Sequence, residues 1–194
     1  MKTKFAVFVL ILLSFHTSSA QDTAPFSKVC SITAGSGYAN GVDNSSGGAS
    51  IFVQLSYQLS PQFSLAMEFD HLNYEAPGLY PALPNNLDFQ HFFDDNFSLL
   101  IKYHLPINSK LRASVASGWT FYTRQTEYYE YYKDANGEYI TYRIYSFSDF
   151  GIPFLLETFY PVWKKLSAGL RLKYNVNPNN GSTYSAAIGV SLSL

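Results

Sequence analysis

Histidine, serine and acidic residues are the first candidates for chemistry in this 194-residue chain. Nucleophilic catalysis needs a serine, a histidine and an acid that converge beside an oxyanion donor. His71, His91 and His104 lack a nearby serine on the same face at the outer end of a strand. The aspartates beside His71 and His91 could hold a divalent cation, but carboxylates at an exposed rim are ordinarily solvated. No phosphate loop or zinc-ligand spacing occurs. We therefore predict no catalytic residue, no cofactor and no metal site.

A run of tyrosines after Thr123 has the composition of a binding surface. Tyrosine combines apolar area with a hydrogen-bonding hydroxyl, and it is enriched where proteins bind partners. The run is centred on residues 134–137, Asp-Ala-Asn-Gly, which predict the turn of a long β-hairpin. The candidate binding residues are Tyr128, Tyr129, Tyr131, Tyr132, Tyr139, Tyr142 and Tyr145. Alternatively, the rings only brace the hairpin through cross-strand pairs or contact lipopolysaccharide head groups.

Charged residues also occur inside segments whose residues alternate in polarity. The members of this set are Glu68, Lys102, Arg112, Glu157, Arg171 and Lys173. Their neighbours at spacing two are mostly small or polar. What these charges do depends on the elements that carry them.

The last two segments show the alternation most clearly. Residues 166–176 alternate apolar side chains with polar or small ones, and residues 184–194 repeat the pattern after a turn-forming stretch. A strand of roughly 9 to 11 residues with one apolar face can cross a bilayer at a tilt. The sequence therefore predicts two membrane-crossing strands here.

Six earlier segments carry the same alternation. They are 28–36, 51–59, 63–70, 96–105, 111–121 and 150–157. The connections between them are alternately long and short, beginning with a long loop over 37–49 and including a second loop over 75–92. We predict an all-β, eight-stranded antiparallel up-and-down transmembrane barrel, with short turns in the periplasm and long loops outside. The hairpin around 124–146 would then be extracellular.

Composition and the N-terminal residues agree with export. Charged residues make up 14% of the chain, below the roughly 25% of soluble domains, and aromatic residues make up 18%. The formal net charge of −1 offers no basic surface for nucleic acid. Lys2 and Lys4 precede a short apolar core and the small residues Ser18-Ser19-Ala20. We therefore predict a signal peptide over 1–20, cleavage between Ala20 and Gln21, and a barrel domain over 21–194.

With these features the chain resembles the small outer-membrane barrels of the OmpA/OmpX type. The resemblance covers residues 28–194 and depends on the strand pattern and the alternating loop lengths. It implies a bacterial outer-membrane location, with membrane lipid and lipopolysaccharide around the barrel.

The small residues of the polar faces indicate which face points inward. Gly, Ala and Ser suit the crowded interior of a narrow barrel, whereas a soluble lipocalin-like barrel would turn its apolar face inward. Aromatic residues also gather near both ends of the strands, as at the two interfaces of a bilayer. The charged set would then line the lumen, and buried charges must be paired. We expect Glu157 to pair with Arg171 and Glu68 with Lys102. A proton or ion path is the alternative.

These observations predict a non-enzymatic outer-membrane barrel whose extracellular loops bind another envelope protein or a glycan. Adhesion, or a role as an accessory subunit of an envelope complex, would follow. Two alternatives stay open: a narrow channel or carrier for small solutes, and a lipid-modifying enzyme.

Overall fold

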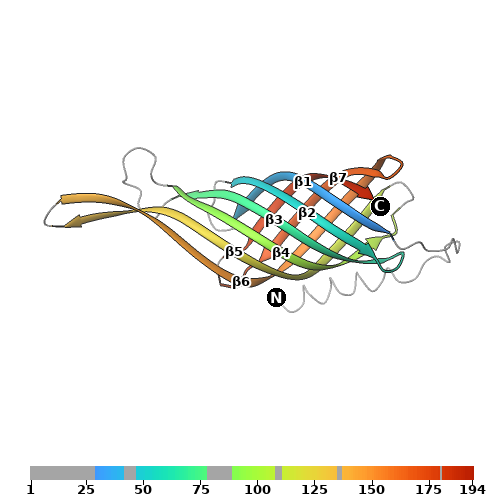
Figure 1. The fold of residues 1–194 in the computed structure, drawn as a ribbon, viewed down its shortest axis with the longest axis horizontal. Coiled ribbons are helices and arrows are strands. Elements are labelled where there is room, and N and C mark those ends of the chain that lie inside the picture. The colour runs from blue at the N-terminus through green and yellow to red at the C-terminus, as the bar shows by residue number, and fades with distance from the viewer. Residues whose placement is uncertain (1–28, 42–46, 78–88, 108–110, 135–136, 180) are drawn as a thin grey trace.

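The computed structural model describes residues 29–41, 47–77, 89–107, 111–134, 137–179 and 181–194. The strands are β1 (Cys30–Gly41), β2 (Gly47–Gln58), β3 (Phe63–Pro77), β4 (Phe89–Leu105), β5 (Arg112–Asp134), β6 (Gly137–Trp163), β7 (Leu166–Val176) and β8 (Thr183–Ser193). Each pairs antiparallel with the next, and β1 pairs with β8 to close the barrel (Figure 1). The predicted eight-stranded up-and-down fold is confirmed.

The residues of the predicted signal peptide and its cleavage site, between Ala20 and Gln21, lie outside the described part of the chain. Within that part, no helix has the length and hydrophobicity that a membrane crossing by a helix requires.

The two ends of the barrel differ. The β2–β3, β4–β5 and β6–β7 connections leave from one end, here called the short-turn end. At the other end, the hairpin end, β5 and β6 continue beyond their neighbours to the pair Asp134–Gly137 (Figure 1). The long hairpin predicted around 124–146 is therefore one continuous extension of the barrel wall.

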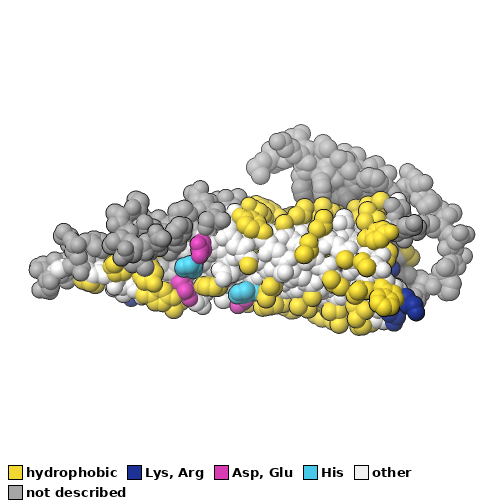
Figure 2. Space-filling model, turned by 90° about the horizontal axis from the view of Figure 1, so that it is seen from above, with side chains coloured by type: hydrophobic (Ala, Val, Ile, Leu, Met, Phe, Trp, Pro, Cys, Tyr) yellow, Lys and Arg dark blue, Asp and Glu magenta, His cyan; other side chains and the backbone are white. Residues whose placement is uncertain are grey.

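Alternation along each strand decides which side chains face outward. On β2, Ile51, Val53 and Leu55 are exposed on the outer surface, whereas Phe52 and Gln54 between them are buried in the lumen. On the face shown in Figure 2, apolar side chains lie along the barrel wall with areas of other side chains and backbone between them, and acidic and histidine side chains gather near the hairpin end. An apolar exterior around a polar interior is the arrangement of a membrane barrel and the reverse of a soluble one.

Aromatic side chains mark both edges of the apolar band. At the short-turn end the Phe63 and Tyr103 rings lie 5.2 Å apart, and Trp163 is 71% exposed. Towards the hairpin end the Phe121 and Phe150 rings meet edge to face at 5.4 Å. Aromatic rings favour the interfaces of a bilayer, so these two belts delimit the part of the wall in contact with lipid tails.

The predicted loop over 37–49 is wrong, because β1 and β2 extend through most of it. Gly37 pairs with Ala187, and a Cβ atom added to Gly37 would lie 2.0 Å from the carbonyl oxygen of Ala186. The glycines and small residues of this stretch permit close strand approach and do not form a long turn.

The ladder between β3 and β4 likewise runs further than predicted, to the pair Pro77–Phe89. The outward positions here hold His71, Asn73 and Glu75. The alternation of apolar with polar residues ends because the wall has passed the apolar band, although the backbone ladder continues. The alternation of apolar with polar residues in the sequence therefore indicates only the lipid-facing part of each strand and not its full length.

Candidate functional site

A network of charged side chains fills the middle of the lumen. Its members are Glu68, Asp70, Lys102, Glu157, Arg171 and Lys173, all of them buried. Glu68 accepts contacts from Arg171 at 2.5 Å and Lys173 at 2.7 Å. Asp70 pairs with the same two cations. Its Oδ1 lies 2.9 Å from the Arg171 Nη2, and its Oδ2 contacts the Lys173 Nζ. Three acids face three bases, so the formal charge of this network is zero, as a low-dielectric interior requires.

Lys102 and Glu157 form the part of the network nearest the short-turn end. Gln54 links this pair to the rest. Its side-chain oxygen accepts a hydrogen bond from Lys102 at 2.7 Å, and its amide nitrogen donates one to Glu68 at 2.7 Å. A neutral amide that both accepts and donates joins the two groups of ions without adding charge.

Of the two expected pairs, the structure contains Glu157 with Arg171 and not Glu68 with Lys102. Glu157 and Arg171 are opposite each other in the β6–β7 ladder, and the Arg171 Nε lies 3.9 Å from the Glu157 Oε1, which makes this the longest ion pair of the network. Glu68 pairs with Arg171 and Lys173, and Lys102 pairs with Glu157. A lumen this narrow also lets long side chains reach across it, so ion pairs form between residues that are not ladder neighbours.

Arg112 does not join the network. It is exposed at the short-turn end, and within the described ranges it forms no ion pair. The expectation that Arg112 would be one of the lumen charge pairs is therefore wrong. The reason is its place as the first residue of β5, where the lumen opens.

A second ion pair closes the lumen towards the hairpin end, and the sequence reasoning missed it. Arg124 contacts both carboxylate oxygens of Asp94, each at 2.7 Å. The Tyr74 hydroxyl donates to Asp94 at 3.2 Å, and the Arg124 guanidinium lies 5.8 Å from the centroids of the Tyr74 and Phe92 rings. Asp94 and Arg124 are cross-strand partners on β4 and β5, so following the strand parity beyond the apolar band would have found them.

Aromatic packing adds to the closure of the middle layer. The Arg171 guanidinium lies 4.0 Å from the centroid of the Phe52 ring. Phe52 fits because Gly35 and Gly189 lie beneath it: a Cβ atom on Gly35 would come within 2.7 Å of the ring. Two charged layers and this aromatic contact give the lumen the character of a packed polar core.

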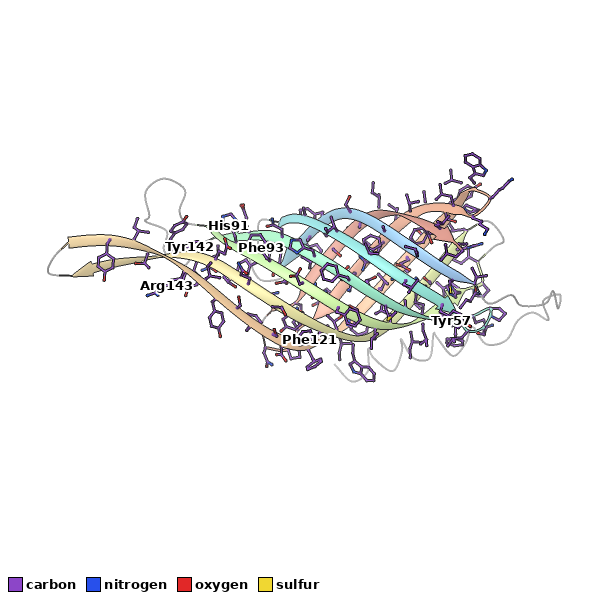
Figure 3. The ribbon with its side chains drawn as sticks, viewed as in Figure 1. Tyr57, His91, Phe93, Phe121, Tyr142 and Arg143 are labelled. Carbon is purple, nitrogen blue, oxygen red and sulfur yellow. The ribbon has the colours of Figure 1, made fainter. Side chains whose placement is uncertain are left out.

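The hairpin presents its side chains on two faces. Tyr139, Arg143 and Tyr145 are separated by even numbers of positions from the inward-facing residues of β6, so they lie on the same face of this strand. We call it the tyrosine–arginine face. Tyr139 is 49% exposed and Tyr145 is 59% exposed. Tyr128 is opposite Arg143 in the ladder. Tyr142 and Arg143 lie on the hairpin beyond His91 and Phe93, at the opposite end from Tyr57 (Figure 3).

The second face contains a bracing contact. Tyr129 and Tyr142 are cross-strand partners with ring centroids 5.4 Å apart. Glu127 accepts a hydrogen bond from the Tyr142 hydroxyl, which raises the pKa of Tyr142 to about 12. Tyr131 and Tyr132 take part in the ladder through their backbones, and their side chains lie outside the described part. Among the candidate tyrosines whose side chains are described, Tyr129 and Tyr142 therefore brace the hairpin, although Tyr142 is itself 47% exposed.

The described residues contain a serine–histidine contact that the sequence did not indicate. Ser64 and His104, on adjacent strands, lie 2.6 Å apart between Oγ and Nε2 at the short-turn end. Among the described residues no carboxylate contacts the other ring nitrogen of His104, so the third member of a triad is absent there. His71 and His91 pair with Asp95 and Glu75 on the outer surface. The described residues contain no group of three that could hold a metal ion.

A closed eight-stranded wall, an apolar exterior between aromatic belts and a neutral polar lumen define a small transmembrane β-barrel of the outer-membrane type. Solved structures of this class share the fold. Neisserial surface protein A (NspA) is 18% identical, with a TM-score of 0.53 over 86% of this chain and 96% of that chain. The N-terminal β-barrel domain of Pseudomonas aeruginosa OprF is 14% identical, with a TM-score of 0.52 over 86% and 97%.

A third similar structure is Ail, the attachment invasion locus protein of Yersinia pestis, solved in complex with the heparin analogue sucrose octasulfate. It is 9% identical, with a TM-score of 0.55 over 87% of this chain and 100% of that chain. No protein-family model and no curated protein matches the sequence. At these identities the similarity shows the fold alone.

Proposed function

We propose that this protein is a non-enzymatic outer-membrane barrel whose β5–β6 hairpin binds another envelope protein or a glycan outside the cell. The observation that carries the proposal is the tyrosine–arginine face, which is exposed on a ladder that extends beyond the barrel. Adhesion, or a role as an accessory subunit of an envelope complex, follows from a barrel that holds such a surface above the membrane.

The chemistry of this face favours binding. Tyrosine and arginine are the residues that most often dominate binding energy, because each combines a large contact area with directed hydrogen bonds. The hairpin backbone is paired over its whole described length to Asp134–Gly137. Little backbone entropy is therefore lost when a partner binds, which favours affinity.

The closed lumen argues against the alternative of a channel or carrier. Lys102, Glu157 and Gln54 lie across the lumen, and Arg171 and Lys173 contact Glu68 and Asp70 behind them. An ion on this path would have to break contacts between buried charges, each of which is expensive to leave unpaired. A lipid-modifying enzyme has no support in the described residues, because the serine–histidine contact lacks an orienting acid.

The binding proposal is tested with a variant of one face and a matched variant of the other. Tyr139→Thr, Arg143→Thr and Tyr145→Thr together remove the tyrosine–arginine face and keep β-prone residues. Ile140→Thr with Ile144→Thr changes exposed residues of the opposite face. Cross-linked envelope extracts and a glycan array measure capture by each folded barrel.

We expect the first variant to lose at least about tenfold in affinity for whatever the native barrel captures, since hot-spot residues each contribute about 2 kcal/mol. The second variant should bind within about twofold of the native barrel. Equal capture by both variants and the native barrel would count against the proposal.

Export is part of the same proposal. We expect signal peptidase to cleave between Ala20 and Gln21, leaving a mature barrel that begins at Gln21. The mass of the protein purified from outer membranes measures this, and retention of residues 1–20 would contradict it.

A further inference from the structure

The short-turn end of the barrel contains a cavity separate from the hairpin. Its volume is about 390 Å³, within the range of small-molecule sites. It lies between the β2–β3 turn at Pro61 and the two ends of the β4–β5 connection, at Leu105 and Leu111. The charged network forms its floor through Lys102, so the cavity is a pocket and not a passage.

The polar lining of this pocket is rich in hydrogen-bond donors. Among the described residues that line it, the titratable side chains are all basic types: Lys102, His104 and Arg112. Hydroxyl groups come from Ser31, Ser56, Ser64 and Ser193. Glu157, which pairs with Lys102, is not part of the lining.

The three basic residues have different roles. Lys102 is neutralised by Glu157, and His104 is fixed by its 2.6 Å contact with Ser64. Arg112 is exposed at the rim and forms no ion pair among the described residues. Its guanidinium is therefore the cation that remains available to a ligand, and its planar donors match the oxygens of a carboxylate or phosphate.

From this arrangement we infer that the pocket binds an oxyanion group, a carboxylate or a phosphate, on a small molecule or chain end that enters from the short-turn side. Arg112 pairs with the anion. The hydroxyls of Ser31 and Ser193 donate further hydrogen bonds, and apolar neighbours such as Val29 and Leu111 contact the body of the ligand. In the orientation proposed above this side faces the periplasm, but the site itself depends only on the lining residues.

The inference is tested on the full chain folded in uncharged detergent micelles. Inorganic phosphate and acetate are titrated separately against chloride at constant ionic strength, and NMR follows the signals of the His104 ring and the Arg112 side chain. Lys164→Gln is the matched control for Arg112→Gln, because Lys164 is exposed in the β6–β7 turn at the same end and does not line the pocket.

We expect saturable binding of at least one anion, with a dissociation constant on the order of millimolar. In Arg112→Gln the binding should be at least about fivefold weaker. Lys164→Gln should stay within about twofold of the native protein. Shifts that do not saturate with either anion, or equal weakening in both variants, would overturn the inference. This result does not depend on whether the hairpin binds a partner, so either proposal can fail without the other.

Two further probes distinguish the sources of the anion. Glycerol phosphate represents a lipid head group, and a short peptide with a free C-terminus, compared with its amidated twin, represents a protein chain end. Preference for glycerol phosphate, or for the free peptide over the amidated one, supports the site and identifies its ligand class. Equal binding of the free and amidated peptides, with no binding of glycerol phosphate, would contradict anion recognition.

Discussion

Arg171 and Arg143 are the same residue type in opposite surroundings. The Arg171 side chain is 1% exposed in the lumen, where it pairs with Glu68 and Asp70 and stacks on Phe52. Arg143 is exposed on the hairpin beside tyrosines. In the lumen, polar groups contact one another and hold the barrel closed. On the hairpin, groups of the same kinds are exposed. Separate substitutions in the two regions test whether the lumen determines stability and the hairpin determines binding.

The largest effect is expected in the middle of the lumen. Arg171→Met removes one cation from a neutral buried network and leaves a carboxylate uncompensated. Such a loss costs about 3 to 5 kcal/mol of unfolding free energy. Urea unfolding in lipid vesicles measures it. Arg143→Met makes the same substitution on the hairpin and should change stability by less than about 0.5 kcal/mol; similar losses in the two variants would contradict the comparison.

The ion pair near the hairpin end provides the next test. Asp94→Asn leaves the buried guanidinium of Arg124 without its carboxylate and should cost about 1.5 to 3 kcal/mol, the range for hydrogen bonds to charged groups. Asp95→Asn, one residue further along β4, removes an exposed partner of His71 and should cost less than about 1 kcal/mol. The same unfolding assay compares them, and a reversed order would show that the Asp94 pair does not support the barrel.

Replacing the tip of the hairpin should have a small effect on stability. Glu127 and Ile144 are cross-strand partners, so residues 128–143 can be replaced by Asn-Gly, which forms a two-residue hairpin turn. An isolated two-stranded hairpin is marginally stable at best. We therefore expect the unfolding free energy to change by at most about 1 kcal/mol. A larger loss would mean that the hairpin holds the barrel together.

The smallest effect concerns a single hydroxyl group. Glu127 raises the pKa of Tyr142 to about 12, because its carboxylate accepts a hydrogen bond from the phenol hydroxyl and its charge disfavours the phenolate. Glu127→Gln removes that charge, so the pKa of Tyr142 should fall towards the ordinary value of about 10. A titration followed by NMR of ring-labelled tyrosine measures this. Glu75→Gln is the control and should leave the Tyr142 pKa unchanged.

The fold could be predicted from sequence wherever lipid contact imposed a pattern. The alternation of apolar and polar residues in β7 and β8 reflects one apolar face, and the structure has strands of nearly the predicted bounds there. Above the apolar band no such constraint acts. Residues 37–41 and 47–49 and the outer halves of β3 and β4 therefore carry no alternation, although their backbone ladders continue.

The site was predictable in part. Strand parity placed Glu68, Glu157 and Arg171 in the lumen correctly, because parity depends on the backbone alone. Their partners depend on how far side chains reach across a closed barrel, which the order of residues does not contain. The contact between Ser64 and His104 and the pocket beside Arg112 likewise arise only when the strands are in register.

The division between lumen and hairpin is tested most directly by partner capture with the barrel that carries Asn-Gly in place of residues 128–143. We predict that this barrel folds, migrates as a heat-modifiable band like the native protein, and captures nothing above background from cross-linked envelopes or a glycan array. Capture equal to that of the native barrel would contradict this division, because the binding surface would then lie elsewhere on the molecule.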